Sequence, residues 1–472
     1  MEPQGYASAA KVAISDRHYD ARMHLRHTVA VLAIVATACS TTSSPSATDT
    51  PSTSGPLSVA AAPPPTSLSV DGPTPVPLSD TDLPYFPIRS SRAPSGNLAE
   101  QPISNGGTFA PPISFLVDPE SIRIDLAVVS GDLYISVASV TDSALTRATL
   151  TNDGIGLEGA VQWAGVGPDP MFGSVGDNVG FVDLPDRTAQ TGAVPFGDGW
   201  AWVFSEDIVA IGTPNDYSET PVNLLNDTLL ATDGAFIVAL TDPVSRLNHG
   251  IVGDAIEAGG FVVIEDNGAI RSRVVLDEPD VIEGRSAMLG DVTGNGETEV
   301  VVTISNASDG SRMAVFDLDG TLLAESAPIG QGNRWRHQLA IVDDPEGPLI
   351  LTILTPHIGG CLQALRIVNG RLESVAIKGD YSSHTINSRT LDGAYVGDLD
   401  GDGKWEVLVP NQRRNTLVAL SLEGDNFQED FTLVTPEGAR FESNIAVIDW
   451  GDRTVVAIVT VDGAAAIWMT RG

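Results

Sequence analysis

The chain has 472 residues, of which 61 are Asp or Glu and 26 are Lys or Arg, so its formal net charge at pH 7 is −35. A surface this acidic repels the phosphates of nucleic acids and of anionic lipids, which excludes polyanion binding as the main task. The same charge attracts divalent cations. The length is compatible with several domains or with one large all-β or repeat fold.

The N-terminal region predicts an export signal. A stretch with Arg22 and Arg26 precedes a short apolar run, Thr28 to Ala38, which ends at Cys39. A basic flank, an apolar core of this length and small residues before the cut are typical of a secretory signal. The run is too short for a membrane-spanning helix, which needs roughly 20 residues. Met23 is a candidate for the true start of the chain.

The four residues from Ala36 to Cys39, Ala-Thr-Ala-Cys, resemble the lipobox of bacterial lipoproteins. The resemblance implies that residues 1–38 are an extension and signal peptide, and that Cys39 is lipidated and anchors the chain. In this motif leucine is commoner than alanine three residues before the cysteine, the position that Ala36 occupies here. An ordinary cleaved signal with an unmodified cysteine is the alternative. We expect the second cysteine, Cys361, to be a buried free thiol that does not pair with Cys39.

Residues 39–110 are rich in Ser, Thr, Pro and Ala. They lack the apolar periodicity that would offset the entropy of ordering, so we expect a disordered, partly extended tether. A tether behind a lipidated cysteine would lift the next domain away from a bilayer. The protein is therefore expected to be exported and anchored to a bacterial membrane or envelope, with its folded domain outside the cytoplasm.

The remaining chain, residues 111–472, predicts an all-β domain. Short runs rich in β-branched residues, such as Glu299 to Ser305, recur between turn signals, and helical periodicity is absent. A period near 50 built from four short strands is typical of a β-propeller blade. The residues that open successive units are separated by 52, 55 and 51 positions: Asp291, Asp343, Asp398 and Asp449.

Division of about 360 residues by this period predicts seven four-stranded blades, with six or eight as alternatives. A β-sandwich array would not explain the fixed interval. The last unit supplies only three strands, and an open sheet edge invites aggregation. We therefore predict that the segment near Ile113 to Val117 completes the last blade and closes the ring.

The most distinctive local pattern is Asp-Leu-Asp-Gly-Asp-Gly-Lys-Trp-Glu, from Asp398 to Glu406. Oxygen-bearing side chains recur at alternate positions, two glycines permit a tight wrap, and an apolar strand follows. Calcium takes about six to eight oxygen ligands, and such a loop can supply several of them. The predicted ligands are four side chains and one backbone carbonyl: Asp398, Asp400, Asp402, Glu406 and the carbonyl of Lys404.

A weaker copy of this loop runs from Asp291 to Glu299. Only two of its candidate ligands are carboxylates, so we expect weaker calcium binding there, or none. The candidate ligands are Asp291, Thr293, Asn295, Glu299 and the carbonyl of Glu297.

Residues 396–409 and 289–302 resemble the FG-GAP repeat, also called VCBS, of integrin α-chain propellers and many bacterial surface proteins. The resemblance implies a propeller with calcium loops on one rim, each between the first two strands of a blade. The corresponding segments at 343–347 and 449–453 lack the glycines and the ligand spacing, which argues against an ion there.

Histidines and arginines gather in one part of the domain, and neither a Gly-x-Ser-x-Gly nor a His-Glu-x-x-His motif occurs. The candidates for chemistry are His337, His357, His384 and Arg389, near Arg334 and Arg336. Two functions stay open. We favour a monomeric, non-catalytic calcium-binding propeller that binds a protein or glycan. The alternative is a hydrolase or polysaccharide lyase, for which the first four residues should converge in one pocket.

Overall fold

The computed structural model describes residues 57–59, 86–87, 92–98, 107–117, 121–139, 142–151, 154–164, 171–175, 178–182, 184, 191–205 and 207–471. In these ranges the regular structure is β-strand, apart from the short 3-10 helix η1 (Pro436–Gly438), as the sequence predicts. No helix in the described ranges is long and apolar enough to cross a membrane. The predicted signal and Cys39 lie outside the described residues.

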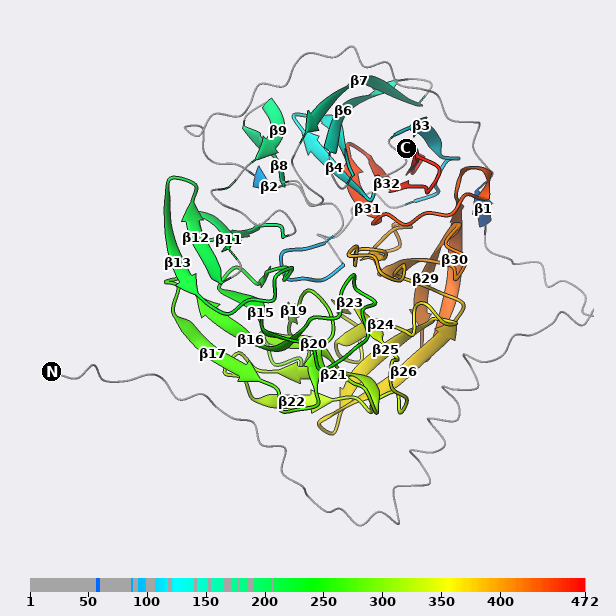
Figure 1. The fold of residues 1–472 in the computed structure, drawn as a ribbon. Coiled ribbons are helices and arrows are strands. Elements are labelled where there is room, and N and C mark those ends of the chain that lie inside the picture. The colour runs from blue at the N-terminus through cyan, green and yellow to red at the C-terminus, as the bar shows by residue number, and fades with distance from the viewer. Residues whose placement is uncertain are drawn as a thin grey trace, which may run out of the picture.

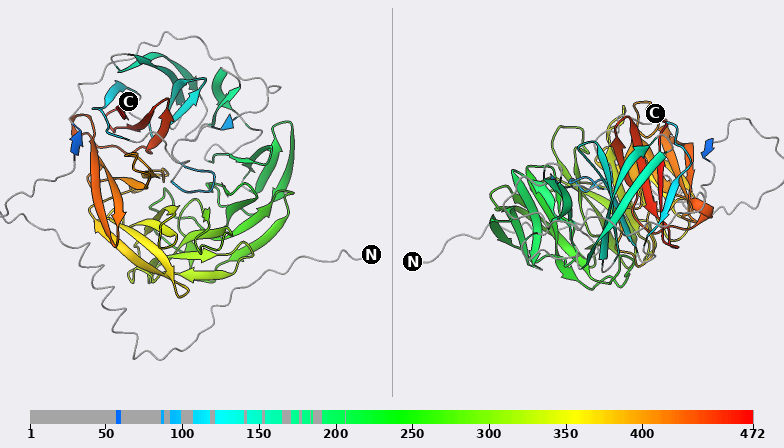
Figure 2. Two further views of the ribbon diagram at one scale, coloured as in Figure 1. Left: turned by 180° about the vertical axis from the view of Figure 1, so that it is seen from behind. Right: turned by 90° about the horizontal axis from the view of Figure 1, so that it is seen from above.

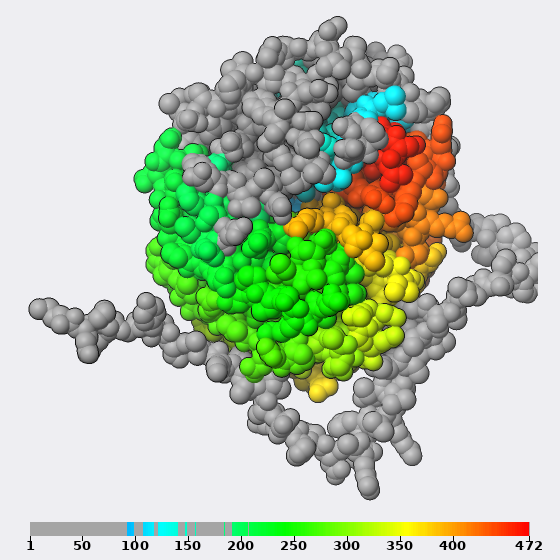
Figure 3. All heavy atoms as spheres, viewed as in Figure 1, coloured from blue at the N-terminus to red at the C-terminus, as the bar shows by residue number. Residues whose placement is uncertain are grey.

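Small, mostly antiparallel sheets follow one another around a ring in chain order (Figure 1). Seen from behind, the sheets are again set side by side around the ring, and the view from above shows the ring edge-on (Figure 2). Packed atoms fill the gaps between neighbouring ribbons from β15 to β30 (Figure 3). The predicted propeller-like arrangement is therefore confirmed.

The first half of the ring contains four hydrogen-bonded sheets. They are formed by β4 (Arg123–Val129), β5 (Asp132–Ala138), β6 (Asp142–Thr151) and β7 (Gly154–Ala164); by β2 (Phe86–Pro87), β8 (Met171–Val175) and β9 (Asn178–Val182); by β10 (Val194–Phe196), β11 (Gly199–Ser205), β12 (Ile208–Thr213) and β13 (Asp216–Pro221); and by β14 (Ala231–Thr232), β15 (Phe236–Val244), β16 (Glu257–Glu265), β17 (Ile270–Val275), β18 (Val281–Ile282), β19 (Met288–Gly290), β20 (Glu299–Asn306), β21 (Gly310–Phe316) and β22 (Leu322–Glu325).

Three further sheets complete the ring. They are formed by β23 (Arg336–Val342), β24 (Leu349–Leu354), β25 (Cys361–Val368) and β26 (Arg371–Gly379); by β27 (Tyr395–Gly397), β28 (Glu406–Pro410), β29 (Thr416–Glu423), β30 (Asn426–Val434) and β1 (Leu57–Val59); and by β31 (Ala446–Trp450), β32 (Arg453–Val459), β33 (Ala464–Met469) and β3 (Ile113–Leu116).

The hydrogen bonds do not divide the described strands into seven equal blades of four, which is how the sequence was interpreted. Four sheets have four strands, and the others have three, five and nine. The nine-stranded sheet arises because β18 pairs with both β16 and β20 and so joins two hairpin-built units. A two-residue strand is thus enough to merge units that the sequence period separates.

The central strands β20 and β24 are buried on both faces because neighbouring sheets pack against one another. All eight residues of β20 and all six of β24 are buried. The outer strand β26 has only two buried positions, Leu372 and Ala376, among its nine residues. One apolar core joins β23, β24 and β25 to β27, β28 and β29, and a similar core joins β31, β32 and β33 to β4 and β5.

The ring closes as predicted. Strand β3 pairs antiparallel with β33, with Ile113 opposite Ile467 and Leu116 opposite Ala464. The chain then continues into β4, which contacts β31 of the same last sheet. The N-terminal strand therefore covers the edge that the three C-terminal strands would expose.

Residues 92–98 belong to the predicted tether by composition, yet they pack in the middle of the ring (blue segment in Figure 1). Leu98 is fully buried in the core. Its N–H donates to the Leu339 carbonyl at 2.8 Å, and its carbonyl accepts from the Val396 N–H at 2.7 Å. The segment thus links β23 to β27.

Three other residues of the segment add specific contacts. The Asn97 side chain donates to the Leu289 carbonyl at 2.9 Å and accepts from the Ile341 N–H at 2.7 Å. Arg92 pairs with Asp392 at 2.6 Å, and both side chains are 5% exposed. Gly96 has φ +82, and a Cβ there would lie 2.1 Å from a backbone oxygen, so this position requires glycine.

Cys361, at the start of β25, is fully buried and disulfide-bonded. The expectation of a free thiol is therefore wrong. The sequence contains one other cysteine, Cys39, which lies outside the described residues.

Candidate functional site

The loop from Asp398 to Trp405 connects β27 to β28, the first two of the four consecutive strands β27 to β30. Gly397 pairs with Glu406, so the loop closes a β-hairpin. Gly401 and Gly403 have φ of +82 and +85, the left-handed conformation that glycine adopts at low cost. The loop therefore lies where the resemblance to calcium-binding repeats places it.

Four carboxylates converge on this loop. Asp398, Asp400, Asp402 and Glu406 each offer one oxygen, and these oxygens all lie within 4.8 Å of one another. Backbone N–H groups donate to all four side chains: Gly401 to Asp398 at 2.8 Å, Leu399 to Glu406 at 2.7 Å, Asp402 to Asp400 at 3.0 Å, and Lys404 to Asp402 at 2.8 Å. A set of hard oxygen donors in this arrangement suits calcium.

The carboxylates repel one another in the absence of a cation. Burial, and next the charge of Asp400, raise the pKa of Glu406 to about 8. Burial likewise raises the pKa of Asp400. Lys404 offsets little of this charge, because its ammonium lies 3.3 Å from Asp402 at an exposed position. A divalent cation would stabilise the ionised form of all four groups. A fifth ligand from the Lys404 carbonyl stays a prediction.

Without a cation, Glu406 is expected to make the protein less stable as the pH rises from about 4.5 to about 8. In this window the folded protein retains a proton that the unfolded chain has released, because burial raises the pKa of Glu406 from 4.5 to about 8. Stability falls wherever the folded state binds more protons than the unfolded state. Thermal unfolding in EDTA at several pH values would measure this slope for the wild type and for Glu406→Gln. The variant should lose part of it, and identical slopes would contradict the pKa assignment.

The loop from Asp291 to Glu299, between β19 and β20, has the same hydrogen bonds. The Val292 N–H donates to Glu299 at 2.8 Å, and the Gly294 N–H donates to Asp291 at 2.6 Å. Gly294 and Gly296 have φ of +76 and +83. The backbone of this loop thus repeats that of the Asp398 loop.

Two ligand positions differ between the loops, and at one of them Asn295 replaces Asp402. Thr293 occupies the position of Asp400, and its hydroxyl donates to Glu299 at 3.0 Å. Asp400 cannot donate when ionised and repels Glu406 instead. The Asp291 loop therefore satisfies its buried glutamate internally, and Thr293, Asn295 and the Glu297 carbonyl remain weaker candidates for metal ligands.

The predicted histidines lie together around Trp335. The Trp335 ring stacks on His337, with centroids 4.9 Å apart and planes at 18°, and meets His384 edge-on at 5.1 Å. His357 Nε2 lies 2.7 Å from His384 Nδ1. The structure thus brings together all three histidines that the sequence singled out.

Burial keeps these histidines neutral. It lowers the pKa of His357 to about 4 and that of His384 to about 3, and it lowers the pKa of His337 well below its ordinary value. His384 Nε2 lies 2.7 Å from the Ser388 carbonyl, which can only accept, so Nε2 carries the hydrogen. His384 Nδ1 then accepts from His357 Nε2–H, which leaves a lone pair on His357 Nδ1.

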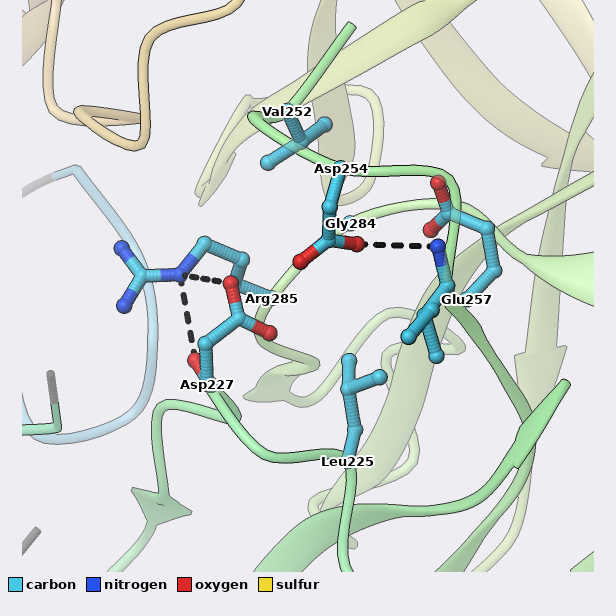
Figure 4. Close-up of a pocket in the computed structure, with 8 residues that line it drawn as sticks. Leu225, Asp227, Val252, Asp254, Glu257, Gly284 and Arg285 are labelled. Carbon is cyan, nitrogen blue, oxygen red and sulfur yellow. Dashed lines mark hydrogen bonds and ion pairs between the residues drawn. The ribbon is translucent and has the colours of Figure 1, made fainter. Parts of the chain in front are cut away.

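Arg389 does not join the histidines. It pairs with Asp227 at 2.8 Å and with Asp254 at 2.9 Å. Asp227 also pairs with Arg285 at 3.0 Å, and Figure 4 shows this pair across a small cavity from Asp254 and Glu257. The predicted convergence of all four residues therefore fails at the arginine.

The cavity in Figure 4 has a volume of about 10 Å³, which is room for roughly one water molecule. Burial, and next the charge of Glu283, raise the pKa of Glu257 to about 9, so Glu257 holds a proton at neutral pH. The cluster of charges is too tightly packed to admit a larger ligand.

Sequence reasoning missed several residues of this region. His249 donates from Nδ1 to Glu283 at 2.6 Å, and Trp335 donates from Nε1 to the Glu283 carbonyl at 3.1 Å. Glu257 opens the buried strand β16. An acidic residue beside an apolar run was the available signal for Glu257, and nothing local marked Trp335.

No protein-family model matches the chain, and no curated protein matches it. Solved structures with a similar fold include BBS1N in complex with ARL6DN, at 10% identity and a TM-score of 0.39 over 81% of this chain and 98% of that chain. A candidate 6-phosphogluconolactonase from Bacteroides fragilis has 14% identity and a TM-score of 0.37, over 71% of this chain and 92% of that chain. The Malassezia sympodialis allergen Mala s 1 has 10% identity and a TM-score of 0.32, over 61% of this chain and 91% of that chain.

These likenesses are too distant to carry an argument about function. The fold defines the chain as an all-β, propeller-like protein. Its site is an acidic loop, Asp398, Asp400, Asp402 and Glu406, that could hold a metal ion.

Proposed function

We propose that the protein is a calcium-binding propeller of the FG-GAP/VCBS type that acts as a non-catalytic binding module. The observation that carries the proposal is the convergence of four carboxylates on one hairpin loop, with Glu406 buried among them. Calcium at this loop would link β27 to β28 and make the rim of the propeller rigid. Division of the chain into seven blades remains a prediction from the sequence period.

The proposal places the protein outside the cytoplasm, anchored by a lipid on Cys39 and acting as a monomer on a protein or glycan partner. A lipid would occupy the Cys39 sulfur, so the proposal requires that Cys361 is not disulfide-bonded to Cys39 in the anchored protein. The support is the basic and apolar signal that precedes Cys39 and the Ser/Thr/Pro-rich tether behind it. Extracellular calcium modules work at 10⁻⁴–10⁻³ M calcium, where a modest site suffices.

Metabolic labelling with an alkyne fatty acid in a bacterial host is expected to label the full chain. The label should disappear in Cys39→Ser, which should also leave the membrane fraction, because one cysteine carries the whole anchor. Cys361→Ser is the matched control and should keep the label. A labelled Cys39→Ser protein, or recovery of a Cys39–Cys361 disulfide peptide from the wild type, would contradict lipidation.

The alternative function, a hydrolase or polysaccharide lyase, finds less support in the geometry. A general base should have a pKa near the working pH, whereas burial lowers the pKa of His357 to about 4 and that of His384 to about 3. Arg389, the fourth residue that should converge in a catalytic pocket, pairs with two aspartates elsewhere. We therefore retain the binding module as the proposed function.

A further inference from the structure

A pocket of about 220 Å³ opens beside the histidine cluster. Four loops form it: the β15–β16 loop, the segment before β23, the β24–β25 loop and the β26–β27 loop. Its lining residues are His249, Ile251, Asn333, Arg334, Trp335, Thr355, Pro356, His357, Ile358 and Ile386. It shares no residue with the calcium loop.

The rim of the pocket is unusually apolar for an exposed site. Ile358 and Ile386 are 62% and 56% exposed, the two highest values for large apolar side chains in the described part of the chain. Both of them line this one pocket. Exposed apolar side chains that gather at a concave site mark a binding surface.

The polar groups of the pocket favour an anion. Arg334 lines it and has no acidic partner among the described residues, where the one hydrogen bond of its side chain goes to the Asn333 carbonyl at 2.9 Å. None of the lining residues is Asp or Glu, in a chain that contains 61 of them. A guanidinium that is not paired with a described carboxylate is a suitable partner for the carboxylate of a ligand.

The pocket wall is held in shape from behind. Trp335 packs with Ile251 and Leu391 in a small buried cluster, and the Asn387 N–H donates to the Ile251 carbonyl at 2.9 Å. Thr355 has φ +45, a conformation that a β-branched residue rarely adopts. Backbone strain of this kind gathers at sites that bind or react.

Two other ligand types fit the pocket less well. A sugar ring usually needs an open aromatic face, but Trp335 is 3% exposed and its ring already stacks on His337. A cation would meet Arg334 and no carboxylate. The volume is also below the roughly 300–1,000 Å³ of drug-sized sites, so the ligand, or the part of it that enters, is small.

We propose that this pocket binds a small carboxylate with a branched or aromatic apolar body, either as a free acid or as the C-terminal residue of a peptide. Arg334 pairs with the carboxylate, and Ile358 and Ile386 cover the apolar body. His249 Nε2 and His357 Nδ1 remain for polar groups of the ligand. The inference deepens the proposed function, on which it rests, by naming the class of ligand that the binding module takes.

Calorimetric titration of the full chain with 4-methylpentanoate and with the peptide Gly-Gly-Leu tests the proposal. Each probe should bind. The same compound with its carboxylate converted to an amide should bind roughly tenfold more weakly, because the amide lacks the charge that pairs with Arg334. Whichever acid binds more tightly identifies the source of the ligand.

Arg334→Gln should weaken binding of the acids roughly tenfold and leave the amides unchanged. The matched control is Arg371→Gln, an exposed arginine of β26 outside the pocket, which should change nothing. Ile386→Ser should weaken acids and amides alike. Absence of binding, or equal affinity for acid and amide in the wild type, would overturn the proposal.

The calcium response of the same variants separates the two hypotheses. Arg334→Gln should keep whatever stabilisation calcium gives the wild type. A wild-type protein that binds the carboxylate probes but no calcium would overturn the proposed function alone. A wild-type protein that binds calcium but none of the carboxylate probes would overturn the inference about this pocket alone.

Discussion

Calcium at 10 mM is expected to raise the melting temperature of the protein by about 2–4 °C. A site with Kd on the order of 10⁻⁴–10⁻³ M, as in extracellular modules, would contribute about 1.4–2.7 kcal/mol at that concentration. An unfolding entropy of roughly 2.1 cal/mol/K per residue over about 350 residues converts this energy into the stated shift. Differential scanning fluorimetry with calcium and with EDTA would measure it.

Asp400→Thr is the matched variant for this prediction because it copies the Asp291 loop. The new hydroxyl can donate to Glu406 as Thr293 donates to Glu299 at 3.0 Å, so the loop should fold without an ion. The variant should show little or no calcium shift and should be at least as stable as the wild type in EDTA. Asp398→Ala is a poorer control, since Asp398 also accepts from the backbone of Gly401 and Gly403. An unchanged calcium shift in Asp400→Thr would contradict the assignment of the site.

Leu98→Ala is expected to lower the stability of the domain by about 2–5 kcal/mol, the range for large-to-small changes in packed cores. With the same unfolding entropy, the melting temperature should fall by about 3–7 °C. Leu98 is fully buried and packs against residues of β23 and β27. The substitution therefore leaves a cavity in the middle of the ring. Chemical denaturation would give the change in the free energy of unfolding.

Leu323→Ala provides the control for Leu98→Ala. Leu323 lies on the outer strand β22 and is 37% exposed, so its truncation should change stability by less than about 0.5 kcal/mol. A chain that begins at residue 99 and keeps β3 should be destabilised in the same way as Leu98→Ala, and more strongly. If both changes leave stability intact, residues 92–98 lie on the ring without supporting it.

The parts of the fold that follow a general rule of loop or sheet structure were predictable from sequence. Ile113 to Val117 was assigned to the last sheet because three strands leave an open edge, and β3 pairs there. The Asp398 loop was assigned to a strand connection because its glycines and carboxylates alternate, and it joins β27 to β28. Neighbouring residues determine the loop, whereas β3 pairs with a distant strand and was predictable because three strands alone leave an edge to be covered.

Features that depend on distant contacts were not predictable in this way. Asn97 bonds to Leu289 and Ile341, which lie 192 and 244 positions away, and no periodicity announces such bonds. Strand β18 joins two units through two residues. Arg389 follows the histidines in sequence, but its guanidinium pairs with Asp227, which lies 162 positions earlier.

Calorimetric titration of calcium into the wild type and into Asp400→Thr tests the central claim most directly. The account predicts one dominant site with Kd on the order of 10⁻⁴–10⁻³ M in the wild type. Asp400→Thr should lose that site, because it removes the carboxylate that faces Glu406. No calcium binding by the wild type, or the same isotherm for the variant, would contradict the account.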